Sequence, residues 1–166
     1  MTNTLRPNFA ERAKAQRFQT RAFIDGRFVD ALDGKTFTTV NPANGEVLTR
    51  IAECDAADVE VAVAAAKAAF EDRRWAGLAP KERKRALLRL ADLVEQHAQE
   101  LALIESLDNG KPVDDALAAD LPDAIGTLRW HAEAIDKLYD QSSPTPGDLV
   151  SLVVREPVGV VGAVIP

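Results

Sequence analysis

The sequence is poor in the residues on which small secreted or metal-binding proteins depend. Its 166 residues include one cysteine, Cys54, and two histidines. This composition excludes an internal disulfide framework and is compatible with a reducing cytoplasm. No stretch reaches the roughly 18 consecutive apolar residues of a membrane span, and the segment from Met1 to Gln19 lacks the apolar core of a secretory signal. We therefore expect a soluble, cytoplasmic protein.

The sequence also has no surplus of positive charge. Lys and Arg number 20 against 26 Asp and Glu, which gives a formal net charge of −6. A protein that binds the phosphate backbone needs a basic face to displace counterions, so we expect neither nucleic acid nor a membrane as partner. The hydrophobic fraction of 46% and the charged fraction of 28% are typical of a globular protein.

Two hairpins are predicted after a polar segment over residues 1–20, which reads as a loosely attached arm or as a short helix over Asn8–Phe18. Asp25-Gly26 separates the apolar-rich arms Ala22–Ile24 and Arg27–Val29, and this dipeptide tolerates the positive φ angles of a tight turn. The second hairpin has β-branched arms around a Pro/Asn/Gly loop. Its arms and loop are Phe37–Val40, Glu46–Ala52 and Asn41–Gly45.

Helical periodicity begins at Asp55, which we expect to cap a helix with Asp58 in its first turn. Pro80 starts the next helix, a third ends before Gly110, and Pro122 starts or kinks a long fourth one. The predicted apolar faces are Val59, Val63, Ala66 and Phe70 in the first helix, Leu87, Leu90, Ala91, Val94 and Ala98 in the second, and Leu117, Leu121, Ile125, Leu128, Ala132, Ile135 and Leu138 in the fourth.

The C-terminal part combines a linker with apolar extended runs. Gln141–Asp148 is a linker by composition, and Leu149–Val154 and Val158–Ile165 read as strands. The last run is almost without polar residues, as in a strand buried on both faces of a parallel sheet. Such a strand needs sheet neighbours, so we expect the chain to be the N-terminal part of a larger fold. The alternative is a small α+β domain that ends in an edge strand.

Four segments in order and spacing resemble the aldehyde dehydrogenase superfamily. They are Phe23–Gly26, Thr39–Glu46, Leu107–Pro112 and Arg155–Gly162. The resemblance implies an α/β fold made of β-hairpins, a helical bundle segment and the start of a Rossmann-like parallel sheet. It divides the chain into an N-terminal arm, the first part of the NAD(P)-binding domain, an oligomerisation arm and a truncated first strand of the dinucleotide-binding sheet. The corresponding ranges are 1–20, 21–140, 141–157 and 158–166.

The resemblance also implies an oxidoreductase with NAD or NADP as its cofactor, the choice between the two being open. Family members attack the aldehyde with a cysteine thiolate and hydrolyse the thioester with a glutamate-activated water. No residue here matches those two groups, so we predict that the 166 residues alone are inactive. Ile165 and Pro166 match the start of the segment that lines the adenine–ribose part of the cofactor site, which gives an incomplete half-site.

Two further pairs of residues match functional positions of the family. Thr39, through its carbonyl oxygen, and Asp108 match a monovalent cation site, and oxygen ligands suit such a hard cation. Asp120 and Asp123 lie three residues apart on a helix and match acids that line the substrate entrance of amino-aldehyde-oxidising relatives. A pair of carboxylates would attract an ammonium or guanidinium group. The alternative for the first pair is that Thr39 is an ordinary strand residue and Asp108 is a surface acid at the end of a helix. The alternative for the second pair is that Asp120 and Asp123 complement the dipole at the start of a helix.

Other candidate residues are better explained without a function. Cys54 has no histidine near it in sequence, and His97 and His131 lack metal-site spacing. Asn109–Pro112 lacks the full glycine spacing of a phosphate-binding loop, and helix termination explains it better.

Two functions follow from the sequence. The run Arg129–Lys137 looks most like the branch that oxidises ω-amino, guanidino or γ-glutamylated amino aldehydes in polyamine breakdown. The complete protein is then an NAD(P)-dependent aldehyde dehydrogenase, and by resemblance a homo-oligomer. The rival is a non-catalytic oligomerisation or interaction module that retains the same architecture.

Overall fold

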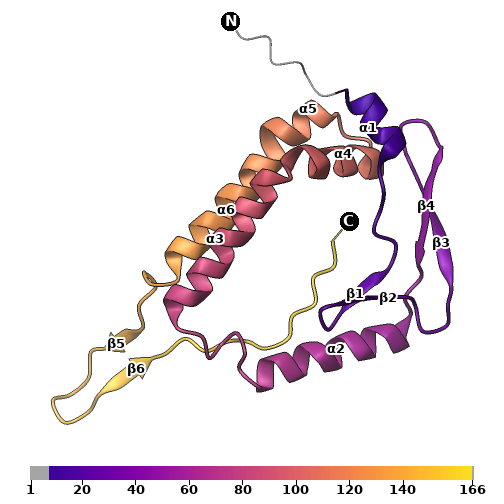
Figure 1. The fold of residues 1–166 in the computed structure, drawn as a ribbon. Helices are drawn as coiled ribbons and strands as arrows, with labels where there is room; N and C mark the ends of the chain where they lie inside the picture. The colour runs from indigo at the N-terminus through magenta and orange to yellow at the C-terminus, as the bar shows by residue number, and fades with distance from the viewer. Residues whose placement is uncertain (1–7, 166) are drawn as a thin grey trace, which may run out of the picture.

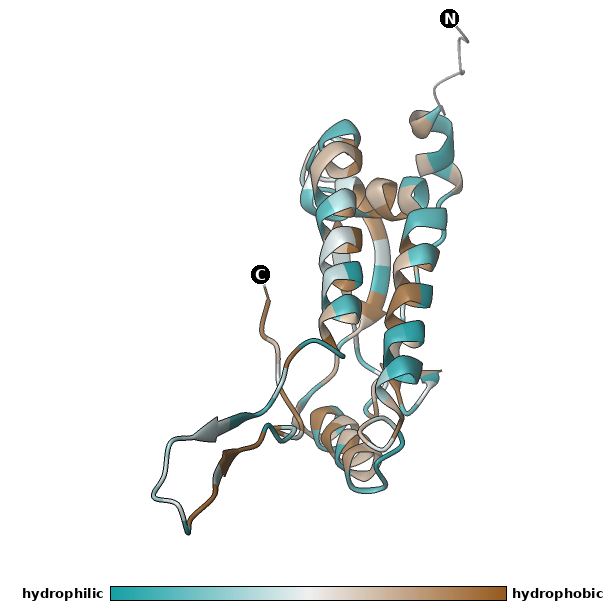
Figure 2. Ribbon diagram, turned by 90° about the vertical axis from the view of Figure 1, so that its left-hand side faces the viewer, coloured by the Kyte–Doolittle hydropathy of each residue, from teal (hydrophilic) through white to brown (hydrophobic). Residues whose placement is uncertain are grey.

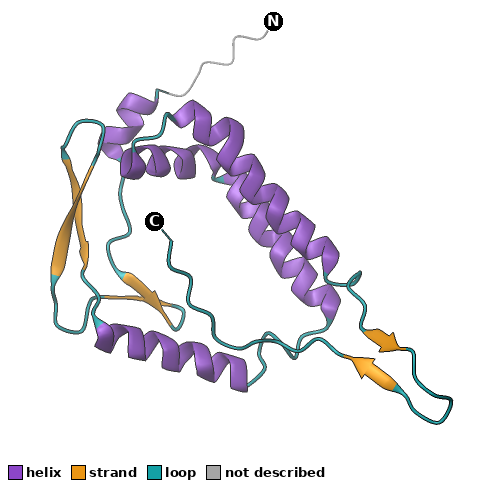
Figure 3. Cartoon of the chain, turned by 180° about the vertical axis from the view of Figure 1, so that it is seen from behind, coloured by secondary structure: helices purple, strands orange, loops and turns teal. Residues whose placement is uncertain are grey.

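The structure, a computed structural model, describes residues 8–165. Helices make most of the body, and the strands form three separate two-stranded antiparallel sheets (Figures 1 and 3). In chain order the elements are α1 (Phe9–Ala15), β1 (Ala22–Ile24), β2 (Arg27–Val29), β3 (Thr36–Val40), β4 (Val47–Ala52), α2 (Ala56–Glu71), α3 (Pro80–Gln96), α4 (Ala98–Asn109), α5 (Val113–Asp115), the π-helical turn η1 (Ala116–Asp120), α6 (Leu121–Ala134), β5 (Gln141–Ser143) and β6 (Ser151–Val153).

Both predicted hairpins are confirmed. β1 pairs with β2 around Asp25 and Gly26, whose φ angles are 49° and 74°. This is the left-handed conformation that an Asp-Gly turn accommodates. β3 pairs with β4, and the register shifts between Thr39 and Val40, which marks a bulge.

Helix α2 begins as predicted but presents a different face to its neighbour. The Asp55 side chain accepts a hydrogen bond from the backbone N–H of Ala57, and Asp58 reaches back to the N–H of Asp55 at 3.0 Å. The half-buried positions of the helix are alanines, namely Ala62, Ala65 and Ala69, and the first hairpin lies against them. The predicted apolar face is therefore not the one covered within residues 8–165: Val59, Val63 and Phe70 are exposed by 56%, 44% and 38%.

Helices α3 and α6 lie side by side and hold most of the packing (Figure 1). Ala91 of α3 and Ala132 of α6 are fully buried, so small side chains occupy the places where the helices meet. Ion pairs between Arg129 of α6 and two acids of α3 join the two helices. The Arg129 guanidinium contacts Asp92 at 3.1 Å and Glu95 at 2.7 Å. A small core of Ala102, Ala116 and Leu121 continues the packing into α4 and η1.

The chain enters α6 through one turn of π-helix. Pro122 is the second residue of α6, and it has no N–H to bond the carbonyl of the preceding turn, against which its ring would also clash. The wider turn over Ala116–Asp120 accommodates this residue. The predicted start or kink at Pro122 is confirmed, and the helix ends at Ala134, before Ile135 and Leu138 of the predicted face.

The C-terminal part corrects two predictions. Gln141–Ser143, placed in a linker from its composition, is strand β5, and it pairs with β6 in a hairpin that stands away from the helices (Figures 1 and 3). Residues 158–165 form neither helix nor strand, because no other strand among the described residues lies beside them to complete a ladder. Their side chains are exposed, Val158 by 93% and Val164 by 101%, and the segment is almost uniformly hydrophobic (Figure 2).

Within residues 8–165, no helix combines the length and apolar character needed to cross a membrane.

Candidate functional site

The structure brings the two predicted cation ligands together. The Thr39 hydroxyl donates a hydrogen bond to Oδ1 of Asp108 at 3.5 Å. Thr39 lies on β3 and Asp108 in the last turn of α4. The link depends on how α4 ends: Gly110 adopts φ +82°, and a Cβ there would lie 3.1 Å from Cγ of Pro42. The loop between β3 and β4 therefore packs directly on the C-terminus of α4.

The chemistry of this junction fits a hard monovalent cation better than a transition metal. It offers hydroxyl and carboxylate oxygens, and such cations prefer oxygen ligands. The part of the chain that the structure describes holds no group of three or more His, Cys, Asp or Glu side chains that could bind a metal ion. The cation role of Thr39 and Asp108 stays a prediction, now with the two residues in contact.

The two predicted entrance acids have different surroundings. Asp120 ends the π turn, and its carboxylate accepts a hydrogen bond from Nζ of Lys111 at 2.5 Å. This contact raises the pKa of Lys111. Asp123 lies one residue after Pro122, and within residues 8–165 its side chain makes no hydrogen bond or ion pair. The charge of Asp120 is thus compensated by Lys111, whereas no described residue compensates that of Asp123.

Asp123 lines a shallow depression of about 340 Å³ on the outer face of α6. The other residues around it are Pro122, Gly126, Thr127 and Trp130. Trp130 is 64% exposed and contacts His131 at a centroid distance of 4.9 Å with the rings tilted by 71°. The depression thus combines a predicted entrance acid and an aromatic ring in its lining.

The described residues do not form the predicted half-site for the cofactor. Ile165 is 82% exposed at the end of the apolar C-terminal segment. Pro166, the other residue predicted to contact the cofactor, lies outside the described residues. Their predicted contact with NAD or NADP remains a prediction.

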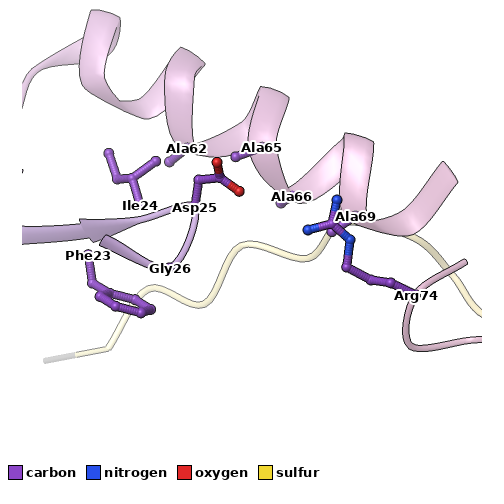
Figure 4. Close-up of a pocket in the computed structure, with 9 residues that line it drawn as sticks. All are labelled: Phe23, Ile24, Asp25, Gly26, Ala62, Ala65, Ala66, Ala69 and Arg74. Atoms are coloured by element: carbon purple, nitrogen blue, oxygen red, sulfur yellow. The ribbon is translucent and has the colours of Figure 1, made fainter. Parts of the chain in front are cut away.

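A larger groove of about 410 Å³ lies between the first hairpin and α2 (Figure 4). Four alanines of α2 line one side of it, and Ile24 and Asp25 of the hairpin line the other. The Asp25 carboxylate points toward the helix, and the Arg74 side chain lies at the far end (Figure 4). The groove contains no nucleophile, no histidine and none of the predicted site residues, so its residues cannot carry out aldehyde chemistry.

The only thiol is unsuited to nucleophilic attack. Cys54 is exposed, and desolvation, followed by the charges of Asp58, Asp55 and Asp33, raises its pKa. A raised pKa leaves the thiol protonated, which is the opposite of what a reactive cysteine needs. The described residues thus show no alternative to the absent catalytic cysteine.

Lys111 and Trp130 are the residues of this region to which sequence reasoning gave no function. Lys111 lies in the segment that ends α4, and its partner Asp120 follows nine residues later across a short helix and the π turn. That spacing fits neither a helical nor a strand period. Trp130 offered a weak signal, because an aromatic residue seven positions after an acid lies on the same helix face.

Comparison with known proteins identifies the chain. The sequence model of the aldehyde dehydrogenase family matches residues 28–166. The aminoacetaldehyde dehydrogenase of Pseudomonas aeruginosa is 54% identical over 167 residues, which is 100% of this chain and 34% of that protein. The chain belongs to the aldehyde dehydrogenase family. It spans about a third of the length of the curated relatives that it matches.

Solved structures agree in fold. The γ-glutamyl-γ-aminobutyraldehyde dehydrogenase of Burkholderia cenocepacia superposes with a TM-score of 0.89 at 47% identity, over 92% of this chain and 31% of that one. The indole-3-acetaldehyde dehydrogenase AldA of P. syringae, solved in complex with NAD+ and IAA, gives a TM-score of 0.88 at 47% identity over the same shares of the two chains. The expected fold, the N-terminal part of an aldehyde dehydrogenase, is confirmed.

Proposed function

We propose that the chain forms the N-terminal third of an NAD(P)-dependent aldehyde dehydrogenase whose substrate is an ω-amino, guanidino or γ-glutamylated amino aldehyde. The observation that carries the proposal is the 54% identity to an aminoacetaldehyde dehydrogenase across the whole chain. A structure of a γ-glutamyl-γ-aminobutyraldehyde dehydrogenase with a TM-score of 0.89 supports the same substrate class. The reaction oxidises the aldehyde to a carboxylate, in a cytoplasmic pathway of polyamine breakdown.

The parts of the mechanism divide between this chain and the remainder of the protein. Bound nicotinamide supplies the hydride acceptor of the reaction, and Ile165 and Pro166 would contribute to the adenine–ribose side of its site. Asp120 and Asp123 would line the substrate entrance and place negative charge there. Thr39 and Asp108 would hold a monovalent cation. With no catalytic Cys or Glu matched here, the 166 residues alone are expected to be inactive.

The exposed apolar surfaces support a role in a larger assembly. The face of α2 that carries Val59, Val63 and Phe70 is open to solvent, as is the segment 158–165. Contiguous apolar surface of this kind marks an interaction site, and we propose that the rest of the cofactor domain covers it. A strand over residues 158–166 would then find sheet neighbours, which residues 158–165 lack within the described part of the chain.

The β5–β6 hairpin supports the proposed oligomerisation arm over residues 141–157. A two-stranded hairpin without further packing is marginally stable in water, and Leu152 and Val153 on β6 are 65% and 51% exposed. Pairing of its open edge with a second subunit would bury these side chains. We propose a homo-oligomer on this basis.

The test is an assay of the complete protein for NADH or NADPH formation with γ-aminobutyraldehyde and with pentanal, its uncharged analogue of equal length. We expect the double variant Asp120→Ala/Asp123→Ala to raise KM for γ-aminobutyraldehyde and to leave KM for pentanal unchanged. Equal changes for both aldehydes would contradict the substrate class. An intact mass near 18.0 kDa would show that the assayed species is a fragment, for which no turnover is expected. Absence of turnover of either aldehyde by the complete protein would instead favour the non-catalytic interaction module.

A further inference from the structure

The depression beside Asp123 has an acid at one end and an aromatic ring at the other. Asp123 and Trp130 are seven residues apart on α6. Seven residues turn a helix by about 700° and advance it by about 10 Å, so both side chains lie on one face, two turns apart. Gly126 and Thr127 occupy the turn between them.

The space between the two ends is open because of a glycine. A Cβ at Gly126 would meet no atom within 4 Å, so no neighbouring group fills this position among residues 8–165. Helical side chains lean toward the N-terminus of their helix, and Trp130 lines this depression together with Gly126 and Asp123. The Trp130 ring also contacts His131.

The electrostatics differ between the two acids of this region. Lys111 already supplies a cation to Asp120 at 2.5 Å. Asp123 has no such partner in the described chain. An incoming cation therefore meets an uncompensated carboxylate at Asp123, whereas at Asp120 it would have to displace an ammonium group.

We infer that Asp123, Gly126 and Trp130 form a slot for the distal cation of the substrate, and that Trp130 is its specificity-determining aromatic wall. This inference rests on the proposed function and deepens it. The carboxylate accepts hydrogen bonds from an ammonium or guanidinium group, the alkyl spacer lies over Gly126, and the indole attracts the same cation through its ring face. A neutral aldehyde gains nothing from this arrangement.

The test compares KM for γ-aminobutyraldehyde and for pentanal in the complete enzyme. Trp130→Leu is expected to raise KM for γ-aminobutyraldehyde about threefold, the effect of losing a solvent-exposed cation–π contact, and to leave KM for pentanal unchanged. Trp130→Phe, which keeps a ring face, should recover part of the loss. Inhibition by n-butylammonium, which has the cation but no aldehyde, should weaken in the same order as the KM changes.

The matched control is Trp75→Leu, which removes the other tryptophan, from the segment between α2 and α3. Trp75→Leu should change neither the ratio of the KM values for γ-aminobutyraldehyde and pentanal nor the inhibition by n-butylammonium. If the wild-type enzyme oxidises γ-aminobutyraldehyde and Trp130→Leu changes both aldehydes equally, or neither, the slot is wrong and the proposed function stands. If the wild-type protein oxidises no amino aldehyde, both are wrong.

Discussion

The Thr39 hydroxyl on β3 donates a hydrogen bond to the Asp108 carboxylate at the end of α4, and 69 residues of sequence separate the two. The contact joins the second hairpin to the helical part of the chain. It also concentrates oxygen atoms at the position where the family resemblance predicts a monovalent cation. Both a structural and a ligand role are open to Asp108, and they can be separated by experiment.

The first prediction concerns cation binding at this junction. A bound ion stabilises the native state by an amount that grows with the logarithm of its concentration above Kd, so KCl should raise the Tm of the complete protein above its value in choline chloride of equal ionic strength. Asp108→Ala should abolish this increment. Thr39→Val removes the hydroxyl and keeps the carbonyl oxygen, and should retain it. An unchanged increment in Asp108→Ala would exclude the site.

A second prediction concerns Asp58, which is 3% exposed. Its carboxylate accepts hydrogen bonds from the N–H of Leu32 at 2.9 Å and of Asp55 at 3.0 Å. Asp58→Ala leaves both donors without this partner and should lower the free energy of unfolding by about 2 kcal/mol, measured by denaturant titration. The control Asp55→Ala removes the cap of α2 and should cost about 1 kcal/mol. If Asp58→Ala lowers the free energy of unfolding by less than Asp55→Ala does, the two hydrogen bonds accepted by Asp58 do not stabilise the fold as predicted.

A third prediction concerns Gly110 at the end of α4. Gly110 has a φ of +82°, which an alanine rarely adopts, and a Cβ added there would lie 3.1 Å from Cγ of Pro42. Because of this backbone strain and this close contact, Gly110→Ala should destabilise the fold by about 1–2 kcal/mol. Gly126 lies inside α6, where a Cβ meets nothing within 4 Å, so Gly126→Ala should stabilise by about 0.5–1 kcal/mol. Thermal melts of the two variants should move in opposite directions.

The fourth prediction concerns pH. Hydrogen bonds from Lys84 and then Lys137 hold the pKa of Glu133 below its usual range, with Lys84 Nζ at 2.7 Å. A lowered pKa in the native state means that the contribution is present at neutral pH and is lost as the pH falls through that lowered value. Lys84→Met should therefore be less stable than wild type at neutral pH, and the difference should disappear as the pH falls through the lowered pKa of Glu133.

The control for this pH effect is Lys81→Met on the same helix, since Lys81 forms no ion pair within the described residues. Its difference from wild type should be small and independent of pH. A stability difference for Lys84→Met that persists in acid would show that packing of the lysine stem, and not the ion pair, is what the substitution removes.

Features encoded by a few neighbouring residues could be predicted from the sequence. The Asp25-Gly26 turn, the Asp55 cap and the Gly110 terminus each depend on conformational preferences that act within one turn. The position of Pro122 was predictable for the same reason. No local pattern indicates that Thr39 and Asp108 lie close together. The family resemblance predicts it, because both residues match one cation site.

Features that depend on distant partners could not be predicted. The large apolar residues of α2 suggested its buried face, but the first hairpin covers the alanines instead. Strand β5 consists of polar residues with low strand propensity, and it exists because β6 pairs with it. The contact of Lys111 with Asp120 requires the π turn, which hydrophobic periodicity does not reveal.

The π turn over Ala116–Asp120 takes up one residue more than an ordinary α-helical turn. Removing one residue there, for instance Ala118, would let the helix continue with ordinary geometry and would leave α6 in nearly the same rotational phase, so Ile125 and Ala132 would keep their places against α3. The cost would fall on Pro122, whose ring would then meet the carbonyl of a regular preceding turn. A single-residue deletion within α6 itself has no extra residue to remove, would rotate the following helix by about 100°, and should be far more damaging.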